Sequence, residues 1–158
     1  MIEPSELRKY SLFGGLMQDQ IDGIFPLMKH DTYQAGQDLI VEGENNGRVF
    51  FIVSGRVAII KNALVLMEFK EGNTVGEMEV LDMMPSAATV RALERVEAVS
   101  VSNGALYEIY KQDVKAFAIV MMNLARDLSR RLRRLDDLAT QNNADVLPHA
   151  SIYQAING

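Results

Sequence analysis

The chain has 158 residues, 48% of them hydrophobic, and a formal charge of −5 from 16 basic and 21 acidic side chains. This length suits one compact domain, and the absence of cysteine excludes a disulfide scaffold, a thiolate metal site and a cysteine nucleophile. The acidic balance argues against a large nucleic-acid footprint, and no apolar run approaches the ~18 residues of a membrane span. Because the start of the chain shows no signal pattern, we expect a cytoplasmic protein.

Residues 1–30 are predicted to form a helical lead-in. Four apolar residues recur at i, i+3, i+4 and i+7, the spacing of one helical face: Ile21, Ile24, Phe25 and Met28. Pro26 interrupts this pattern, which predicts a short or kinked helix that ends by His30.

Residues 31–110 are predicted to form a β-roll. Short apolar runs alternate with glycine-containing turns, which is typical of a sandwich, jelly roll or barrel. The runs are Leu39–Val41, Val49–Val53, Val57–Ile60, Leu64–Met67, Ala88–Val90 and Ala98–Val101. The two-residue connection Asn62–Ala63 predicts an antiparallel hairpin.

Residues 111–142 are predicted to form a long helix. Its apolar seam has spacings of three and four residues, widened by Leu124 and Leu138, and consists of Met121, Ala125, Leu128, Leu132, Leu135 and Ala139. This seam can pack on its own β domain or on a second copy, so a homodimer through residues 121–139 is expected. The tail, residues 143–158, contains Pro148 and is predicted to be loosely ordered, with one helical turn near Ile152.

Residues 72–90 carry the chemistry. A glycine turn leads into a short helix, followed by a loop containing Pro85 and a returning strand. Backbone amides that follow glycine at a helix start are suited to anions, although this signal is weak by itself.

This segment resembles the phosphate-binding cassette of cyclic-nucleotide-binding domains, the family that includes the catabolite activator protein. The resemblance covers about residues 5–138 and extends to the segments Leu12–Leu16, Tyr33–Gly36, Glu42–Glu44 and Phe50–Val57. It implies a mainly β fold, a β-roll or double-stranded jelly roll, with an N-terminal helix and a long C-terminal helix. That agrees with the pattern of apolar runs.

The resemblance implies a ligand site made of Gly76, Glu77, Met78, Glu79, Ser86, Ala87 and Ala88. Glu77 fills the position of the glutamate that bonds the ribose 2′-hydroxyl; stabilising a helix start is its alternative role. A small residue is expected where Glu79 stands, and an arginine that pairs with the cyclic phosphate is expected where Ser86 stands. We interpret Glu79 as a solvated side chain, with phosphate mimicry by its carboxylate as the alternative.

Both departures predict weakened binding of cyclic AMP or cyclic GMP, and a non-standard nucleotide or another small anion is the alternative ligand. Removing one member of a buried charge pair costs about 2–5 kcal/mol, and Ser86 supplies no charge.

The remaining candidate residues favour structural roles. Met83 and Met84 are predicted to pack under the cassette loop, and Thr89 to be a strand residue. The basic cluster between Arg126 and Arg134 is interspersed with acids, which favours a solvated helix face. The 16 residues that follow the long helix, 143–158, are too few for a helix-turn-helix domain. No metal cluster or nucleophile–base arrangement is evident, so neither a metal site nor an enzyme is expected.

Two functions remain open. The first is a regulatory sensor in which a nucleotide or small anion in the β-roll moves the long helix, and an unknown protein partner responds. The second is a degenerate domain that binds no ligand and acts as a dimerisation or docking module.

Overall fold

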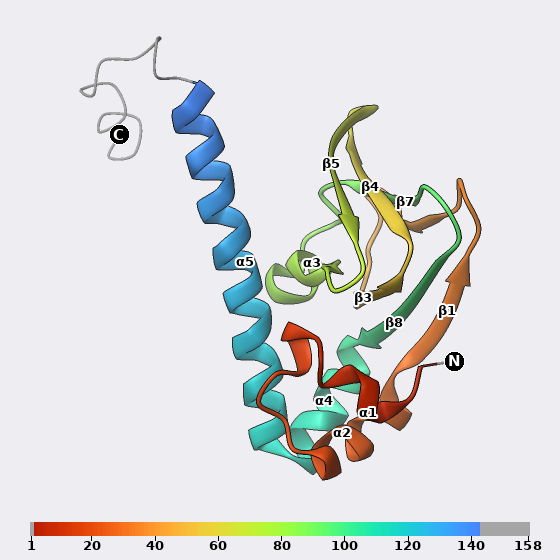
Figure 1. Cartoon of the computed structure of the whole chain (residues 1–158), viewed down its shortest axis with the longest axis vertical. Coiled ribbons are helices and arrows are strands. Elements are labelled where there is room, and N and C mark those ends of the chain that lie inside the picture. Colours follow the sequence, from red (N-terminus) through yellow and green to blue (C-terminus); the bar gives the residue numbers. More distant parts are fainter. Residues whose placement is uncertain (1, 143–158) are drawn as a thin grey trace. The chain divides into compact units, whose positions relative to one another are not determined.

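The computed structural model describes residues 2–142. Along the chain, helices precede and follow the strands, which form two antiparallel sheets (Figure 1). The N-terminal helices are α1 (Pro4–Leu7), η1 (Ser11–Phe13), α2 (Gln18–Ile24) and η2 (Phe25–Leu27). The strands are β1 (Lys29–Tyr33), β2 (Asp38–Ile40), β3 (Arg48–Ser54), β4 (Arg56–Lys61), β5 (Leu64–Lys70), β6 (Thr74–Val75), β7 (Thr89–Ala92) and β8 (Val96–Ser102). Helix α3 (Glu77–Asp82) lies between β6 and β7, and helices α4 (Asn103–Gln112) and α5 (Val114–Asn142) follow β8.

The strands form two four-stranded sheets, in the orders β1-β8-β3-β6 and β2-β7-β4-β5. All the pairings within them are antiparallel, and the segments in each sheet come from distant parts of the chain. The mainly β fold with helices at both ends is therefore confirmed. The predicted hairpin is also confirmed: β4 and β5 are joined through Asn62 and Ala63, which both have positive φ.

Strand β3 contributes side chains to two apolar clusters, one on each face of the first sheet. Successive side chains of a strand point to opposite faces. Phe50 and Ile52 accordingly belong to a cluster shared with Val57 and Val90 of the second sheet, whereas Val49 and Phe51 join the cluster of the helices. The Phe51 ring makes edge contacts with Tyr10 and Phe13, at centroid distances of 4.5 and 5.6 Å. We call the face of the first sheet that carries Phe50 and Ile52 the inner face.

The N-terminal helical face is confirmed, because Ile21 and Ile24 are buried and α2 gives way to the 3-10 helix η2 at Pro26. Strands β1 and β6 and helix α4 were not predicted. Strand β1 (Lys29–Tyr33) contains no aliphatic residue, and β6 has only two residues. Neither strand therefore has the apolar run by which the other strands were predicted.

The chain divides into two units, residues 1–124 and 125–158, and α5 runs from the first into the second. In the first unit, the α5 residues Ala116, Val120 and Leu124 are buried in the cluster of the helices. The buried Asn123 amide donates hydrogen bonds to the backbone oxygens of Leu12 and Gly14, at 3.0 and 2.9 Å.

In the second unit, Leu132, Leu135 and Leu138 of the predicted seam are exposed. Four of the five clustered arginines, at positions 126, 130, 133 and 134, are exposed, as expected for a solvated helix face, whereas Arg131 is half-buried. Arg130 pairs with Asp127 at 2.8 Å. The predicted tail, with its turn near Ile152, lies outside the described residues.

Candidate nucleotide-binding site

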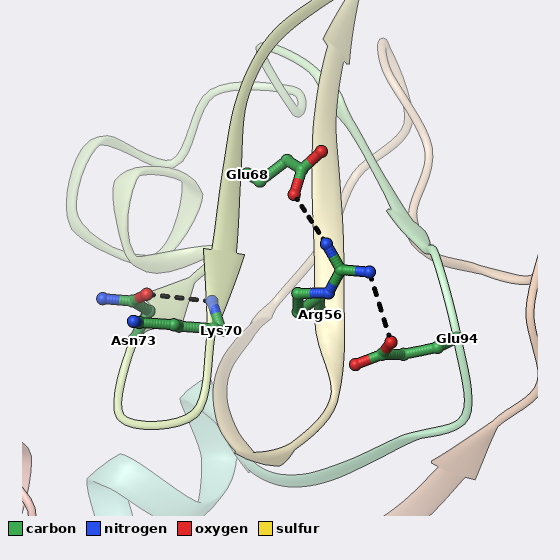
Figure 2. A network of polar contacts seen from close by, with 5 residues as sticks. All are labelled: Arg56, Glu68, Lys70, Asn73 and Glu94. Carbon is green, nitrogen blue, oxygen red and sulfur yellow. Dashed lines mark hydrogen bonds and ion pairs between the residues drawn. The ribbon is translucent and has the colours of Figure 1, made fainter.

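A tight turn leads into the candidate site. The backbone N–H and oxygen of Lys70 bond the side-chain oxygen and backbone N–H of Asn73, each at 3.0 Å (Figure 2 shows the first of these bonds). Gly72, with φ +87°, supplies the left-handed residue inside this turn. The Asn73 oxygen and the Gly72 N–H then bond Ile52 of β3, which fixes the start of the cassette against the first sheet.

Gly76 is the residue at which β6 changes into α3. It has φ +80° and is the N-cap of α3, so its conformation alone favours glycine. A Cβ at this position would lie 2.4 Å from the Arg48 backbone oxygen and 2.7 Å from Asn46 Nδ2. The Asn46 amide itself donates to that Arg48 oxygen at 2.7 Å, so the obstacle is a fixed piece of β3.

Helix α3 alternates between the interior and the surface in its first turn. Glu77 is 2% exposed and Glu79 is 9% exposed, whereas Met78 lies on the surface. The interpretation of Glu79 as a solvated side chain is therefore wrong. Both acids lie in the first turn of α3 and are buried there, although residues two apart on a helix do not share a face. Within residues 2–142, no hydrogen bond or ion pair engages the Glu79 carboxylate.

Ser86 is held firmly by its backbone. Its N–H donates to the Glu44 oxygen at 2.9 Å, and its oxygen accepts from the Gly43 N–H at 2.8 Å. The residue is 3% exposed, and its Oγ is buried with no hydrogen-bond partner in the described part of the chain. A buried hydroxyl without a partner is uncommon, because its desolvation is not compensated. This atom therefore marks a place where a polar group of a ligand would be stabilised.

The rest of the cassette loop lies nearer the solvent. Ala87 is exposed and Ala88 is half-buried. Thr89 begins β7 and its Oγ1 accepts from the Glu42 N–H at 2.9 Å, as a strand residue does. The prediction that Met83 and Met84 pack under the loop is wrong, since they are 81% and 62% exposed. Met83 ends α3 in the left-handed conformation, with φ +58°.

Arg91, the next arginine after Ser86, does not replace the missing cassette arginine. Its Nε and Nη2 donate to the two Asp38 oxygens, at 2.6 and 2.9 Å, and this pairing raises the pKa of the guanidinium. Val90 and Ala92 are buried on either side of it, so the exposed Arg91 side chain lies on the opposite face of β7.

Arg48 is a residue that the sequence analysis did not single out. It begins β3, is half-buried, and its Nη1 donates to the Ser100 Oγ at 3.1 Å. Nearby, burial and the charge of Asp31 raise the pKa of Tyr33, while the charge of Arg48 acts in the opposite direction. The signal that could have found Arg48 is its spacing of two from Phe50 and Ile52, which places it on the inner face.

Within residues 2–142, no group of three or more His, Cys, Asp and Glu side chains could hold a metal ion. None of the helices in the same range is long and apolar enough to cross a membrane.

The fold and the cassette define a class of regulatory domain, and comparison with known proteins assigns the family. The profile of the cyclic nucleotide-binding domain matches residues 30–113, more than half of the chain. The chain therefore belongs to the cyclic nucleotide-binding domain family.

The similar proteins are of different kinds. The chain is 28% identical over 129 residues to the rice potassium channel KAT1, a match that covers 79% of this chain and 18% of the channel. It is 32% identical over 113 residues to the Pycsar effector protein XpPycTIR of Xanthomonas perforans, covering 71% of this chain and 36% of the effector. The chain thus corresponds to a small part of each of these proteins.

A cyclic nucleotide-binding domain from Methylobacillus flagellatus has the same fold. The TM-score is 0.79 at 24% identity, and the match covers 87% of this chain and 80% of the other.

Proposed function

We propose that this chain is a sensor module that binds a cyclic nucleotide inside the β-roll, against the cassette of residues 72–90. In this proposal Glu77 accepts a hydrogen bond from the ribose, and the Ser86 hydroxyl donates one to the cyclic phosphate. The observation that carries the proposal is the buried, unbonded Ser86 Oγ, held by two backbone bonds to Gly43 and Glu44. In a cassette that binds no ligand, burying this hydroxyl without a hydrogen-bond partner would cost stability, and nothing would compensate for that cost.

The proposed affinity for cyclic AMP and cyclic GMP is lower than that of a cassette with an arginine. Ser86 offers one neutral hydrogen bond where a guanidinium offers a charge-assisted pair. The buried Glu79 carboxylate adds negative charge to the helix that faces the phosphate. Both features weaken the binding of an anionic phosphate. Ligand selection in this cassette therefore depends more on contacts with the sugar and the base than in a cassette with an arginine.

The proposed output is a change in α5, read by a partner protein. The buried Asn123 and Leu124 connect the first part of α5 to the lead-in helices and the outer face of the first sheet. The exposed leucines at 132, 135 and 138 provide a surface for a second copy, so the proposed module is a homodimer.

Titration calorimetry with cyclic AMP and cyclic GMP tests the binding proposal on the wild type, Ser86→Arg and Glu79→Gln. Restoring a cation at position 86 is expected to raise the affinity by at least about 30-fold, from the ~2 kcal/mol lower bound for a buried charge pair. Glu79→Gln removes the carboxylate without changing the size of the side chain, and is expected to raise the affinity as well.

Two matched controls accompany these variants. Ser129→Arg adds the same charge at an exposed position of α5, and Glu94→Gln removes an exposed carboxylate in the turn between β7 and β8. Both are expected to bind as the wild type does. If neither the wild type nor the cassette variants bind either nucleotide, the sensor proposal is wrong and the docking module is favoured.

A further inference from the structure

Charge is distributed unevenly along the chain. The nine residues Arg126–Arg134 contain five basic side chains and one acidic side chain, a net charge of +4. The rest of the chain has 11 basic and 20 acidic side chains, a net charge of −9. A cationic segment within an otherwise acidic chain favours an interaction surface for an anionic partner.

Four of these arginines share one side of α5. Spacings of four, three and one residues place them on neighbouring turns, and all are exposed: Arg126, Arg130, Arg133 and Arg134. We call these four residues the arginine stripe. Leu128, Leu132 and Leu135 each lie two residues from an arginine of the stripe, which is about 200° around a helix, and so occupy the opposite side. A second copy that covers these leucines therefore leaves the stripe facing outward.

Acidic neighbours neutralise only part of the stripe. Arg130 pairs with the aspartate three residues before it, at 2.8 Å. Within residues 2–142, Arg133 and Arg134 enter no ion pair, although the exposed Asp136 and Asp137 follow closely in the sequence. A guanidinium carries five N–H donors in a planar fork that matches a carboxylate. The last two arginines of the stripe can therefore each bind a carboxylate of another molecule.

The form of the stripe favours an acidic peptide over other polyanions. It extends over roughly 12 Å of helix, and the rest of the chain is acidic, which repels a long phosphate backbone. No aromatic residue lies in Arg126–Arg134 on which a base could stack. A membrane is disfavoured because the arginines would point away from a bilayer that the leucines on the opposite side entered.

We infer that the arginine stripe binds an acidic segment of the partner protein that responds to α5, with its guanidinium groups pairing with Asp or Glu carboxylates. The inference rests on the proposed output through α5 and names the chemistry of the partner. Binding of an acidic peptide does not require the nucleotide, so it can be measured on the ligand-free chain.

The test titrates a fluorescent octaglutamate peptide with the whole chain at low salt and follows the anisotropy. Arg133→Gln combined with Arg134→Gln removes two charges of the stripe, and glutamine is a good helix former. The matched control, Arg56→Gln combined with Arg95→Gln, removes the same charge from exposed arginines that already pair with glutamates at 2.9 to 3.4 Å (Figure 2 shows those of Arg56). Arg133→Lys combined with Arg134→Lys keeps the charge, and thermal unfolding of each variant checks that it folds.

The wild type is expected to bind octaglutamate, and added salt to weaken that binding. The glutamine variant of the stripe is expected to lose roughly 3- to 30-fold in affinity, the loss expected for two ion pairs at a surface. The lysine variant should retain most of the affinity, since both ammonium groups still attract carboxylates, and the control should bind as the wild type does.

The outcomes that overturn the inference are distinct from one another. They include an absence of octaglutamate binding, and equal losses in the glutamine variant of the stripe and in the control. Tighter binding of a thymidine oligonucleotide of matched charge, or of vesicles containing phosphatidylserine, would assign the stripe to a nucleic acid or a membrane. Self-association beyond a dimer that the same glutamine variant abolishes would assign it to the acidic surface of a second copy. Failure of the wild type and of Ser86→Arg to bind cyclic AMP overturns the proposed sensor and leaves the octaglutamate result unaffected.

Discussion

Gly76 offers a sharp test of how the cassette is built. Gly76→Ala has two costs, and the first is the positive φ of +80°, which costs an L-residue about 1–2 kcal/mol. The second is the new Cβ, which would lie 2.4 Å from the backbone oxygen of Arg48, so β3 or the start of α3 must move. Overpacking of this kind adds about 1–3 kcal/mol. The sum predicts a destabilisation of roughly 2–5 kcal/mol.

Gly72→Ala is the matched control within the same segment. Gly72 has nearly the same φ, +87°, but its Cβ would meet nothing closer than a ring carbon of Tyr10 at 3.9 Å. Only the conformational cost of about 1–2 kcal/mol is expected there. Urea unfolding measures both values, with the slope checked for two-state behaviour. Equal destabilisation by the two variants would show that the close approach to Arg48 is not a constraint in solution.

Three further predictions concern α5. Asn123→Ala should destabilise the fold by about 2–3 kcal/mol in chemical denaturation, since two backbone oxygens lose their donor; a loss below about 0.5 kcal/mol would contradict this. Asp113 accepts from the Ala116 N–H at 2.9 Å, and this bond lowers its pKa below 3.8. The Asp113 contribution is therefore present above that pH and lost as the pH falls through the lowered pKa, so Asp113→Ala should reduce the Tm at pH 7 and progressively less in strong acid. A constant Tm difference down to pH 2 would refute this account. Glu at both Leu132 and Leu135 should convert the proposed dimer to a monomer in a sedimentation concentration series; a wild type that is monomeric throughout the series would reject the dimer.

The fold was predictable from the sequence because its central strands have strong apolar runs. Strands such as Val49–Val53 bury both faces, and the hairpin at Asn62–Ala63 has a turn length that allows few alternatives. Strand β1 escaped prediction because it consists of polar and aromatic residues at the edge of a sheet. Its pairing with β8 depends on the tertiary structure, which no local pattern reports.

The candidate site was predictable only in part. The order of residues identified the cassette, but the burial of Glu79 and the exposure of Met83 depend on which side of the short helix faces the roll. Arg48 is about 30 residues away from the cassette in the chain, and strand pairing brings them together.

The central claim is that a cyclic nucleotide binds inside the roll against residues 72–90. Amide and arginine side-chain NMR spectra of the ¹⁵N-labelled wild type, recorded during titration with cyclic AMP, test it most directly. We expect the largest shift changes at Gly76, Glu77 and Ser86. Unchanged spectra at millimolar nucleotide, or changes confined to the exposed face of α5, would contradict the claim.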